Sequence, residues 1–182
     1  MSAMSQLTIR AEPATAAALA PFGDLIAVDT NDTGRDVPDY NARIWKPADF
    51  ASDADTTLST VRLDRRPFAI RWLERHFKHT QVFLPLNGKP FIVALAPPME
   101  GDMPDPASVR AFRFDGSQGV CMKVGTWHEF PFPLEDDTHA IVILRHETNR
   151  NLQQRSGTDA YGDDLDKKDV QIRWGRTLAV EP

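Results

Sequence analysis

Two short segments of the sequence carry histidine together with other groups that can bind a metal or move a proton. The first, LERHFKHTQVFLPLNG, covers residues 73–88 and contains His76. The second, GSQGVCMKVGTWHEFP, covers residues 116–131 and contains His128. Imidazole, carboxylate and amide oxygen can all bind divalent metals, and imidazole and carboxylate are common general acids and bases. If the two segments lie on neighbouring strands, they can supply one site.

The first segment has a face that begins apolar and ends polar. In an extended strand Trp72, Glu74 and His76 share one face, and this apolar start favours a site that faces inward. The alternative is a solvated strand end, because glutamate is rarely buried unless it is paired. Gln81 begins the next strand. His79 lies in the turn between them, where we expect it to face water.

The second segment places a histidine just after a glycine turn. His128 follows Gly125 by three residues, and Lys123 precedes it by two. A lysine there could bind a carboxylate substrate, although an exposed lysine is the simpler interpretation. Trp127 could belong to the core, and a lone histidine is more often structural than catalytic. None of these residues is a specific signal by itself.

Short strands separated by turn residues must position these side chains. The strands are rich in β-branched and aromatic residues, which predicts an all-β sandwich or small barrel. A short helix is predicted over residues 13–19, with Pro13 in its first turn. Asn87-Gly88 favours a tight hairpin. The predicted strands cover residues 7–11, 25–28, 58–63, 68–75, 81–86, 91–96, 109–114, 120–122, 129–132 and 139–144.

Length and composition bound the class of protein. A chain of 182 residues predicts a single domain, with a core over about residues 7–146 and a polar C-terminal extension over residues 149–182. Residues 29–55 are predicted to form a long ordered loop over the core rather than a regular element. Disorder is an alternative for the first half, whereas aromatic residues are expected to anchor the second half to the core.

Charge and cysteine usage indicate the partners and the compartment. The net charge of −5 gives no basic surface for nucleic acid, and no apolar run is long enough to span a membrane. The N-terminus has no signal-peptide pattern. Cys121 is the only cysteine, which excludes an internal disulfide and fits a reducing compartment. We therefore expect a cytoplasmic protein with a small-molecule substrate.

The spacing of the two segments resembles the two motifs of the cupin superfamily: Glu74-x-His76-x4-Gln81-x6-Gly88, then Gly125-x2-His128. In that superfamily the first motif normally supplies two histidines and a carboxylate, and the second supplies one more histidine. This chain keeps His76 and His128 but has Glu74 and Gln81 at the other two positions. Such a set of oxygen and nitrogen ligands can still hold a metal.

A wider set of motifs resembles the ureidoglycolate lyase family. The resemblance implies a homodimeric, cupin-like jelly-roll barrel (a double-stranded β-helix). It also implies an enzyme of allantoin and purine degradation that splits ureidoglycolate into glyoxylate and urea, with a divalent metal such as nickel, manganese or zinc. The motifs are Pro21-Phe22-Gly23-Asp24, Leu73-Glu74-Arg75-His76, Thr80-Gln81, Phe83-x-Pro85, Gly88, Arg110-Ala111-Phe112, Gln118-Gly119-Val120 and Trp127-His128.

This resemblance implies roles for residues of both segments. A base must take the hydroxyl proton of the substrate, the departing urea nitrogen needs a proton, and a cation should bind the substrate carboxylate. The expected catalytic residues are His76, Lys123, His128 and Glu129, the expected substrate-binding residues are Arg75, Lys123 and Trp127, and the expected metal ligands are Glu74, His76, Gln81 and His128.

Two positions depart from the family pattern. The family commonly has histidine where this chain has Lys123, and a second histidine where it has Glu129. One alternative is therefore an enzyme for another small ureido or hydroxy acid. The other is a cupin that binds a metabolite without catalysis, which the changes at Glu74 and Gln81 favour. Fold alone does not decide between them.

Overall fold

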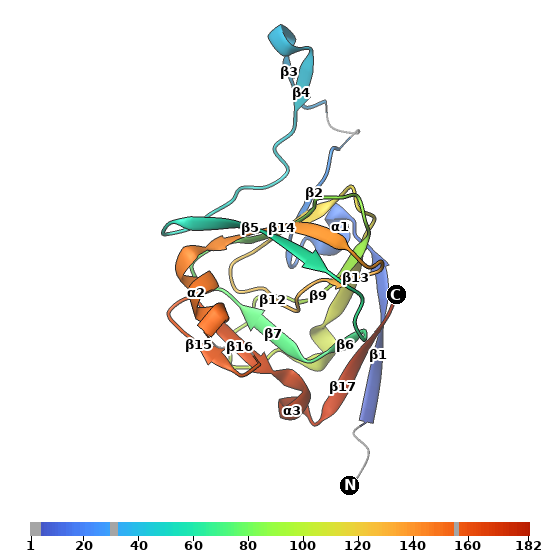
Figure 1. The fold of residues 1–182 in the computed structure, drawn as a ribbon, viewed down its shortest axis with the longest axis vertical. Helices are drawn as coiled ribbons and strands as arrows, with labels where there is room; N and C mark the ends of the chain where they lie inside the picture. Colours follow the sequence, from blue (N-terminus) through green and yellow to red (C-terminus); the bar gives the residue numbers. More distant parts are fainter. Residues whose placement is uncertain (1–4, 30–32, 155–156) are drawn as a thin grey trace.

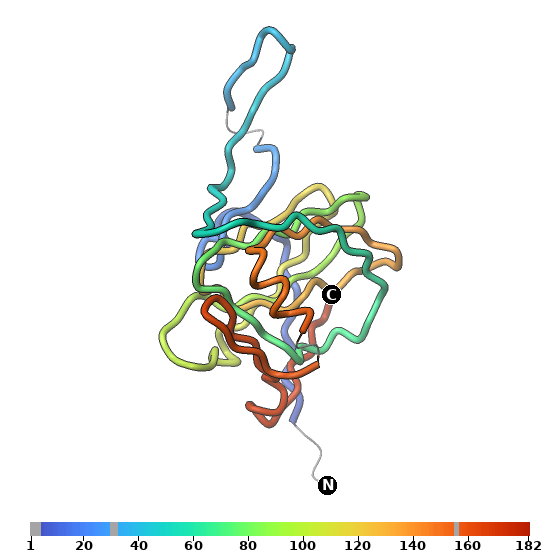
Figure 2. Tube along the Cα trace, turned by 60° about the vertical axis from the view of Figure 1, so that its left-hand side comes forward, coloured from blue at the N-terminus to red at the C-terminus, as the bar shows by residue number. Residues whose placement is uncertain are grey.

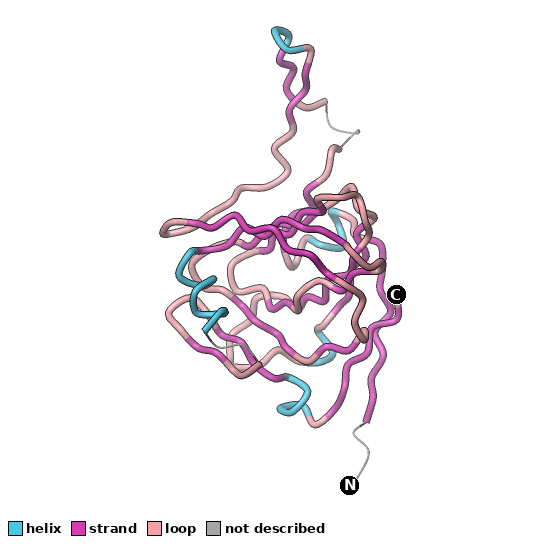
Figure 3. Tube along the Cα trace, viewed as in Figure 1, coloured by secondary structure: helices cyan, strands magenta, loops and turns pink. Residues whose placement is uncertain are grey.

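The computed structural model describes residues 5–29, 33–154 and 157–182, and it is built mainly of β-strands (Figure 3). Two curved sheets, one of ten strands and one of five, enclose a common interior (Figure 1). Helices are few and short, the longest being α2 with nine residues. The prediction of a mainly β fold is confirmed.

The ten-stranded sheet joins strands from both ends of the chain and from its middle. Its order is β15 (Ala160–Tyr161), β16 (Asp166–Asp169), β7 (Trp72–Arg75), β12 (Trp127–His128), β9 (Phe91–Ala96), β10 (Arg110–Phe114), β1 (Ser5–Pro13), β17 (Arg176–Glu181) and β6 (Ala69–Ile70), with β13 (Phe132–Pro133) paired to β9.

The five-stranded sheet covers the other side of the interior. Its order is β2 (Gly23–Ile26), β11 (Gly119–Met122), β8 (Gln81–Pro85), β14 (Thr138–Arg145) and β5 (Thr56–Leu63). The remaining elements are the hairpin of β3 (Arg35–Val37) and β4 (Ala42–Ile44), the helices α1 (Ala16–Leu19), α2 (His146–Gln154) and α3 (Val170–Trp174), and two 3-10 turns, η1 (Pro38–Tyr40) and η2 (Pro106–Ser108).

Strand β9 shows how the core is divided. All six of its residues are buried, because both faces of the strand are covered. Phe91, Val93 and Leu95 belong to the apolar cluster between the two sheets. The alternate residues Ile92 and Ala94 belong to a second cluster on the outer side of the large sheet, to which helix α3 and strand β17 also contribute side chains. A side chain of β9 therefore faces the barrel interior only if it belongs to the set of Phe91, Val93 and Leu95.

Three local predictions are wrong. The strands that flank Asn87-Gly88 belong to different sheets, so this turn connects the sheets and closes no hairpin. The strand expected over residues 129–132 is replaced by short pairings at Trp127–His128 and Phe132–Pro133, because Pro131 between them has no N–H to donate. Helix α1 begins at Ala16 and is capped by Thr15, while Pro13 ends strand β1.

The C-terminal segment is part of the large sheet rather than an external tail. Strand β17 runs parallel to β1, and the two lie side by side in Figures 1 and 2. Strand β16 pairs with β7, the strand that carries the first histidine segment. Trp174 packs against the outer apolar cluster, as expected of an anchor. Within the described ranges, no helix is long and apolar enough to cross a membrane.

A β-hairpin replaces the irregular excursion expected after residue 29. The arm hairpin (residues 35–44) projects away from the barrel in both views (Figures 1 and 2). An ion pair of 2.7 Å between Arg43 and Asp36 links its strands, and Asn41 has a positive φ in the turn. Tyr40 at its tip is 81% exposed, so this aromatic does not pack on the core. Residues 30–32, which fall in the half for which disorder is the alternative prediction, lie outside the described part.

Candidate active site

The two histidine segments meet, as predicted, on neighbouring strands. Strands β7 and β12 are antiparallel, with Glu74 directly opposite His128. His128 also lies opposite Leu95, an interior residue of β9, so its side chain and that of Glu74 face the barrel interior. Glu74 Oε1 lies 3.4 Å from Nε2 of His128 and 3.8 Å from Nε2 of His76. The structure thus brings three of the predicted site residues together.

Backbone carbonyl groups fix both imidazole rings of this cluster. Nδ1 of His76 lies 3.3 Å from the carbonyl oxygen of Asp164, and Nδ1 of His128 lies 3.2 Å from that of Thr126. A carbonyl oxygen can only accept, so each Nδ1 carries the proton and donates it. The Nε2 atoms of His76 and His128 are buried and make no hydrogen bond in the described structure. Each therefore presents a lone pair toward Glu74.

This donor set fits a divalent metal ion. One ligand atom each from Glu74, His76 and His128 lie within 4.8 Å of one another. Ligands about 2.1 Å from one ion are at most about 4.2 Å apart, and the 3.4 and 3.8 Å separations satisfy this limit. Metal-bound histidines typically donate their other N–H to a carbonyl or carboxylate, as both do here. Two histidines and a carboxylate suit nickel, manganese or zinc without selecting one.

Gln81, the fourth predicted ligand, lies on the five-stranded sheet, across the interior from Glu74 and His128. It is buried on β8, and its Oε1 has no hydrogen-bond partner among the described residues. Strand parity places it on the face of Phe83, whose ring centroid lies 6.0 Å from that of His128. A buried amide oxygen without a partner is costly, so the position favours a ligand role. Its part in metal binding stays a prediction.

Burial and mutual proximity shift the ionisation of the cluster. Burial disfavours the imidazolium form of His76, and the neighbouring His128 adds to this, so its pKa falls to about 3. Burial opposes the charge of Glu74 as well. The interactions of Glu74 with His128, His76 and Lys167 together outweigh that effect and lower the pKa of the carboxyl group. An ionised Glu74 beside a neutral His76 is the state that binds a cation.

The metal-free protein should lose stability as the pH falls below 6.5. His76 takes up a proton near pH 6.5 in the unfolded chain but only near pH 3 in the folded one, so acid favours unfolding between those values. The slope should approach about 1.4 kcal/mol per pH unit for this one proton. Urea unfolding of chelator-treated protein at several pH values measures it. The variant His76→Gln should flatten the profile, and an unchanged slope in that variant would contradict this assignment.

A small pocket of about 150 Å³ opens onto the cluster. Its size suits a molecule of a few carbon atoms rather than a drug-sized ligand. Of the predicted residues, Glu74, His128 and Glu129 reach its wall. Sequence reasoning missed the other three lining residues, Trp72, Phe130 and Lys167. Strand parity did place Trp72 on the face of Glu74, but no role in the site was predicted for it.

His79 is buried and does not face water, contrary to the prediction. It is 1% exposed, its ring stacks on that of His76 at 4.6 Å, and Nδ1 lies 2.8 Å from Oδ2 of Asp164. The same carboxylate accepts the hydroxyl of Thr148 and the backbone N–H of Phe77. Burial alone would raise the pKa of Asp164, but the bonds from His79 and Thr148 hold it well below its usual range. Asp164 thus holds the first histidine segment in place.

Glu129 adjoins the pocket, but its carboxylate is engaged with backbone groups. Oε2 accepts the N–H groups of Arg71 and Trp72, each at 3.1 Å, where the chain passes from β6 to β7. Oε1 contacts Arg66 at 3.3 Å and the N–H of Phe130 at 3.1 Å. Burial raises the pKa of Glu129 despite these donors. The contacts favour a role in positioning β7, and the predicted catalytic role is untested.

Arg75 and Trp127 lie on the outer face of the large sheet, away from the cluster. Trp127 belongs to the outer apolar cluster, and the guanidinium of Arg75 stacks 4.4 Å from its ring centroid. Arg75 also binds the carbonyl oxygens of Met99 and Gly101 and the carboxylate of Asp166. This outward orientation of both side chains does not favour the substrate-binding role that the resemblance implies for Arg75 and Trp127.

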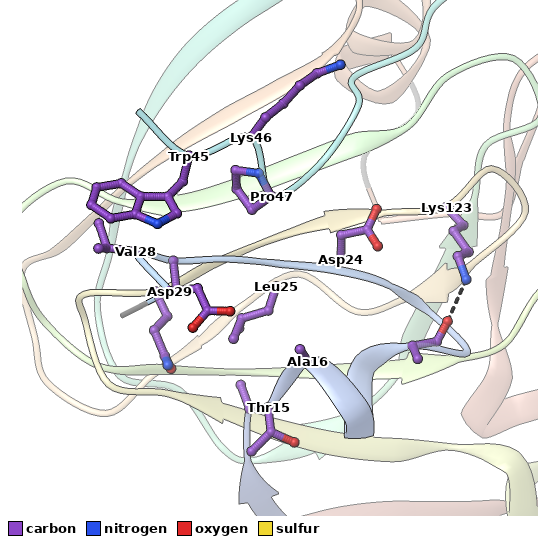
Figure 4. Close-up of a pocket in the computed structure, with 14 residues that line it drawn as sticks. Thr15, Ala16, Asp24, Leu25, Val28, Asp29, Trp45, Lys46, Pro47 and Lys123 are labelled. Atoms are coloured by element: carbon purple, nitrogen blue, oxygen red, sulfur yellow. Dashed lines mark hydrogen bonds between the residues drawn. The ribbon is translucent and has the colours of Figure 1, made fainter. Parts of the chain in front are cut away.

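Lys123 lies in a different pocket from the histidine cluster. It is exposed, and its ammonium donates to the carbonyl oxygen of Ala20 at 2.5 Å, the dashed contact in Figure 4. The pocket has a volume of about 620 Å³ and includes Asp24 and Trp45 in its wall (Figure 4). The structure therefore does not bring Lys123 to Glu74 and His128.

Fold and site together define a β-barrel of two curved sheets with a cluster of two histidines and one carboxylate inside. A family model described as Ureidoglycolate lyase matches residues 6–161, and the chain belongs to this family of lyases.

Curated relatives agree with this assignment. The ureidoglycolate lyase of Azotobacter vinelandii is 36% identical over 148 residues, which cover 79% of this chain and 88% of the relative. That of Pseudomonas putida is 35% identical over 157 residues, covering 84% and 93%. Among solved structures, RmlC from Streptococcus suis in complex with dTDP-D-xylose matches with a TM-score of 0.34 and 13% identity, over 53% of this chain and 48% of that one.

Proposed function

We propose that the protein is a ureidoglycolate lyase that releases glyoxylate and urea, and so acts in allantoin and purine degradation. The observation that carries this proposal is the cluster of Glu74, His76 and His128, in a chain of this family. Glu74 and His128 of this cluster line one small pocket. Ureidoglycolate carries a hydroxyl group and a urea nitrogen on the same carbon. Its cleavage needs proton transfer and charge stabilisation at that carbon, which such a cluster supplies.

The reaction can be followed at the atoms of the cluster. The hydroxyl proton leaves the substrate, the oxygen forms the carbonyl of glyoxylate, and the carbon–nitrogen bond breaks. The electron pair of that bond stays on the urea nitrogen, which then takes up a proton. Nε2 of His128 is one proton acceptor with the required lone pair, and Glu74 at 3.4 Å would stabilise the imidazolium that forms. Phe130 and Trp72 in the pocket wall help to exclude water.

Glu74, His76 and His128, with Gln81 as a fourth donor, would hold a divalent ion. Such an ion supplies a Lewis acid that lowers the pKa of an oxygen bound to it. If such an ion is bound, His128 serves as a metal ligand rather than as the general base. Removal of the metal therefore distinguishes these two roles of His128.

The proposal is tested by incubating purified protein with ureidoglycolate and measuring glyoxylate. We expect a rate well above spontaneous decay. If the cluster binds a catalytic metal, chelation should abolish the activity and added nickel, manganese or zinc should restore it. If His128 is the base, activity should survive chelation. A rate equal to the background under every metal condition would refute the proposal.

We also infer a homodimer in the cytoplasm. Family membership supports the dimer, and so does the arm hairpin, because a two-stranded hairpin without packing partners is marginally stable in water. The one cysteine, Cys121, is free and buried, in keeping with a reducing compartment. Light scattering of the purified protein would give the mass of a single 20.4 kDa chain if the dimer inference is wrong.

A further inference from the structure

Lys167 approaches the active-site cluster from the C-terminal segment. Strand β16 is antiparallel to β7, and Lys167 lies opposite Glu74. It contributes to the wall of the same 150 Å³ pocket as Glu74 and His128. Its positive charge contributes to the lowered pKa of Glu74. This residue lies beyond residue 161, where the family match ends.

The neighbouring lysine is bound in a different way. Lys168 points to the outer face, where it is fully buried and pairs with the carboxylates of Asp102 and Asp166. Among the described residues, none forms a hydrogen bond or ion pair with the ammonium of Lys167, which lies 5.0 Å from the ring centroid of Trp72. One lysine is thus a structural cation, whereas the other offers its donors to the pocket.

The pocket needs a cation if an anion is to enter it. Two carboxylates, Glu74 and Glu129, are in its wall and would repel a substrate carboxylate. Among the described residues that line it, Lys167 alone carries a permanent positive charge. Lys123, which the sequence suggested for this task, donates to Ala20 in the other pocket.

We propose that Lys167 binds the carboxylate of the substrate and so positions the hydroxyl-bearing carbon against Glu74 and His128. This inference rests on the proposed function for the identity of the substrate. The ammonium would form a charge-assisted hydrogen bond with the carboxylate at the pocket wall. The site selects small hydroxy acids or oxo acids over neutral molecules of the same size for this reason.

The variant Lys167→Met tests the proposal, because methionine keeps an unbranched stem beside Trp72 and removes the charge. We expect KM for ureidoglycolate to rise about 10- to 100-fold, with a smaller change in kcat, as for the loss of one hydrogen bond to a charged group. Lys167→Arg should recover most of the loss. The matched control is Lys46→Met, an exposed lysine paired with Asp49, which should leave both constants unchanged.

Equilibrium binding separates this inference from the proposed function. Calorimetry should show that Lys167→Met weakens glyoxylate binding by the same factor and leaves binding of neutral N-(hydroxymethyl)urea unchanged. That result would uphold the inference even if the wild-type protein failed to cleave ureidoglycolate. The inference is overturned by equal losses for both ligands, by unchanged glyoxylate binding, by no glyoxylate binding in the wild type, or by a loss that appears in Lys123→Met instead.

Discussion

Replacing His128 with alanine should lower kcat/KM for ureidoglycolate by about 10²- to 10⁴-fold, the usual contribution of a group that moves a proton or holds a catalytic metal. Its Nε2 lies 3.4 Å from Oε1 of Glu74, closer than Nε2 of His76 at 3.8 Å, and makes no hydrogen bond in the described structure. If the cluster binds a metal, the metal content of the purified variant should fall at least in proportion to its activity. Steady-state kinetics and elemental analysis measure the two effects.

A matched histidine on the surface serves as the control. His139 on β14 is half-exposed and pairs with Asp137, far from the pocket wall. The variant His139→Ala should keep both the activity and the metal content of the wild type. Near-ultraviolet circular dichroism of each variant checks that the barrel is intact. Full activity in a folded His128→Ala protein would exclude the cluster as the site of the reaction.

Replacing Asp164 with alanine should destabilise the protein by about 3–5 kcal/mol, because it leaves several buried donors without an acceptor. Its Oδ1 accepts the N–H groups of Phe77 and Lys78 at 2.9 and 2.6 Å. Its Oδ2 accepts from His79 at 2.8 Å and from Thr148 at 2.5 Å. Urea unfolding of wild type and variant gives the difference in free energy.

The adjacent aspartate is the natural control for this measurement. The side chain of Asp163 is 84% exposed and its only ion pair, to Lys78, spans 3.8 Å among the described residues. Exposed pairs of this kind contribute about 0–1 kcal/mol, so Asp163→Ala should be nearly neutral. The milder variant Thr148→Val should fall between the two. Equal stabilities for Asp163→Ala and Asp164→Ala would show that Asp164 does not hold the histidine segment.

The strands and their inward faces were accessible from the sequence, because alternation along a strand is a local property. The prediction for residues 91–96 matches β9 residue for residue. Parity placed Glu74 on the interior face, and the structure agrees for this residue. The hairpin predicted at Asn87-Gly88 is wrong because strand pairing, unlike alternation, is not a local property. A turn sequence says that the chain reverses, whereas the sheet that receives the next strand is fixed by the whole barrel.

The sequence by itself predicted that His76 and His128 lie together, since each lies in a compact motif whose spacing can be recognised along the chain. Their ring centroids are 5.2 Å apart. Only the tertiary structure decided what surrounds them. His79 is buried by Asp164 from 85 residues away, and Lys167 joins Glu74 through the pairing of β16 with β7. The partners of Arg75 on the outer face, Asp166 and Trp127, also come from distant strands. Such contacts depend on which distant strands become neighbours, and short-range patterns carry no record of that choice.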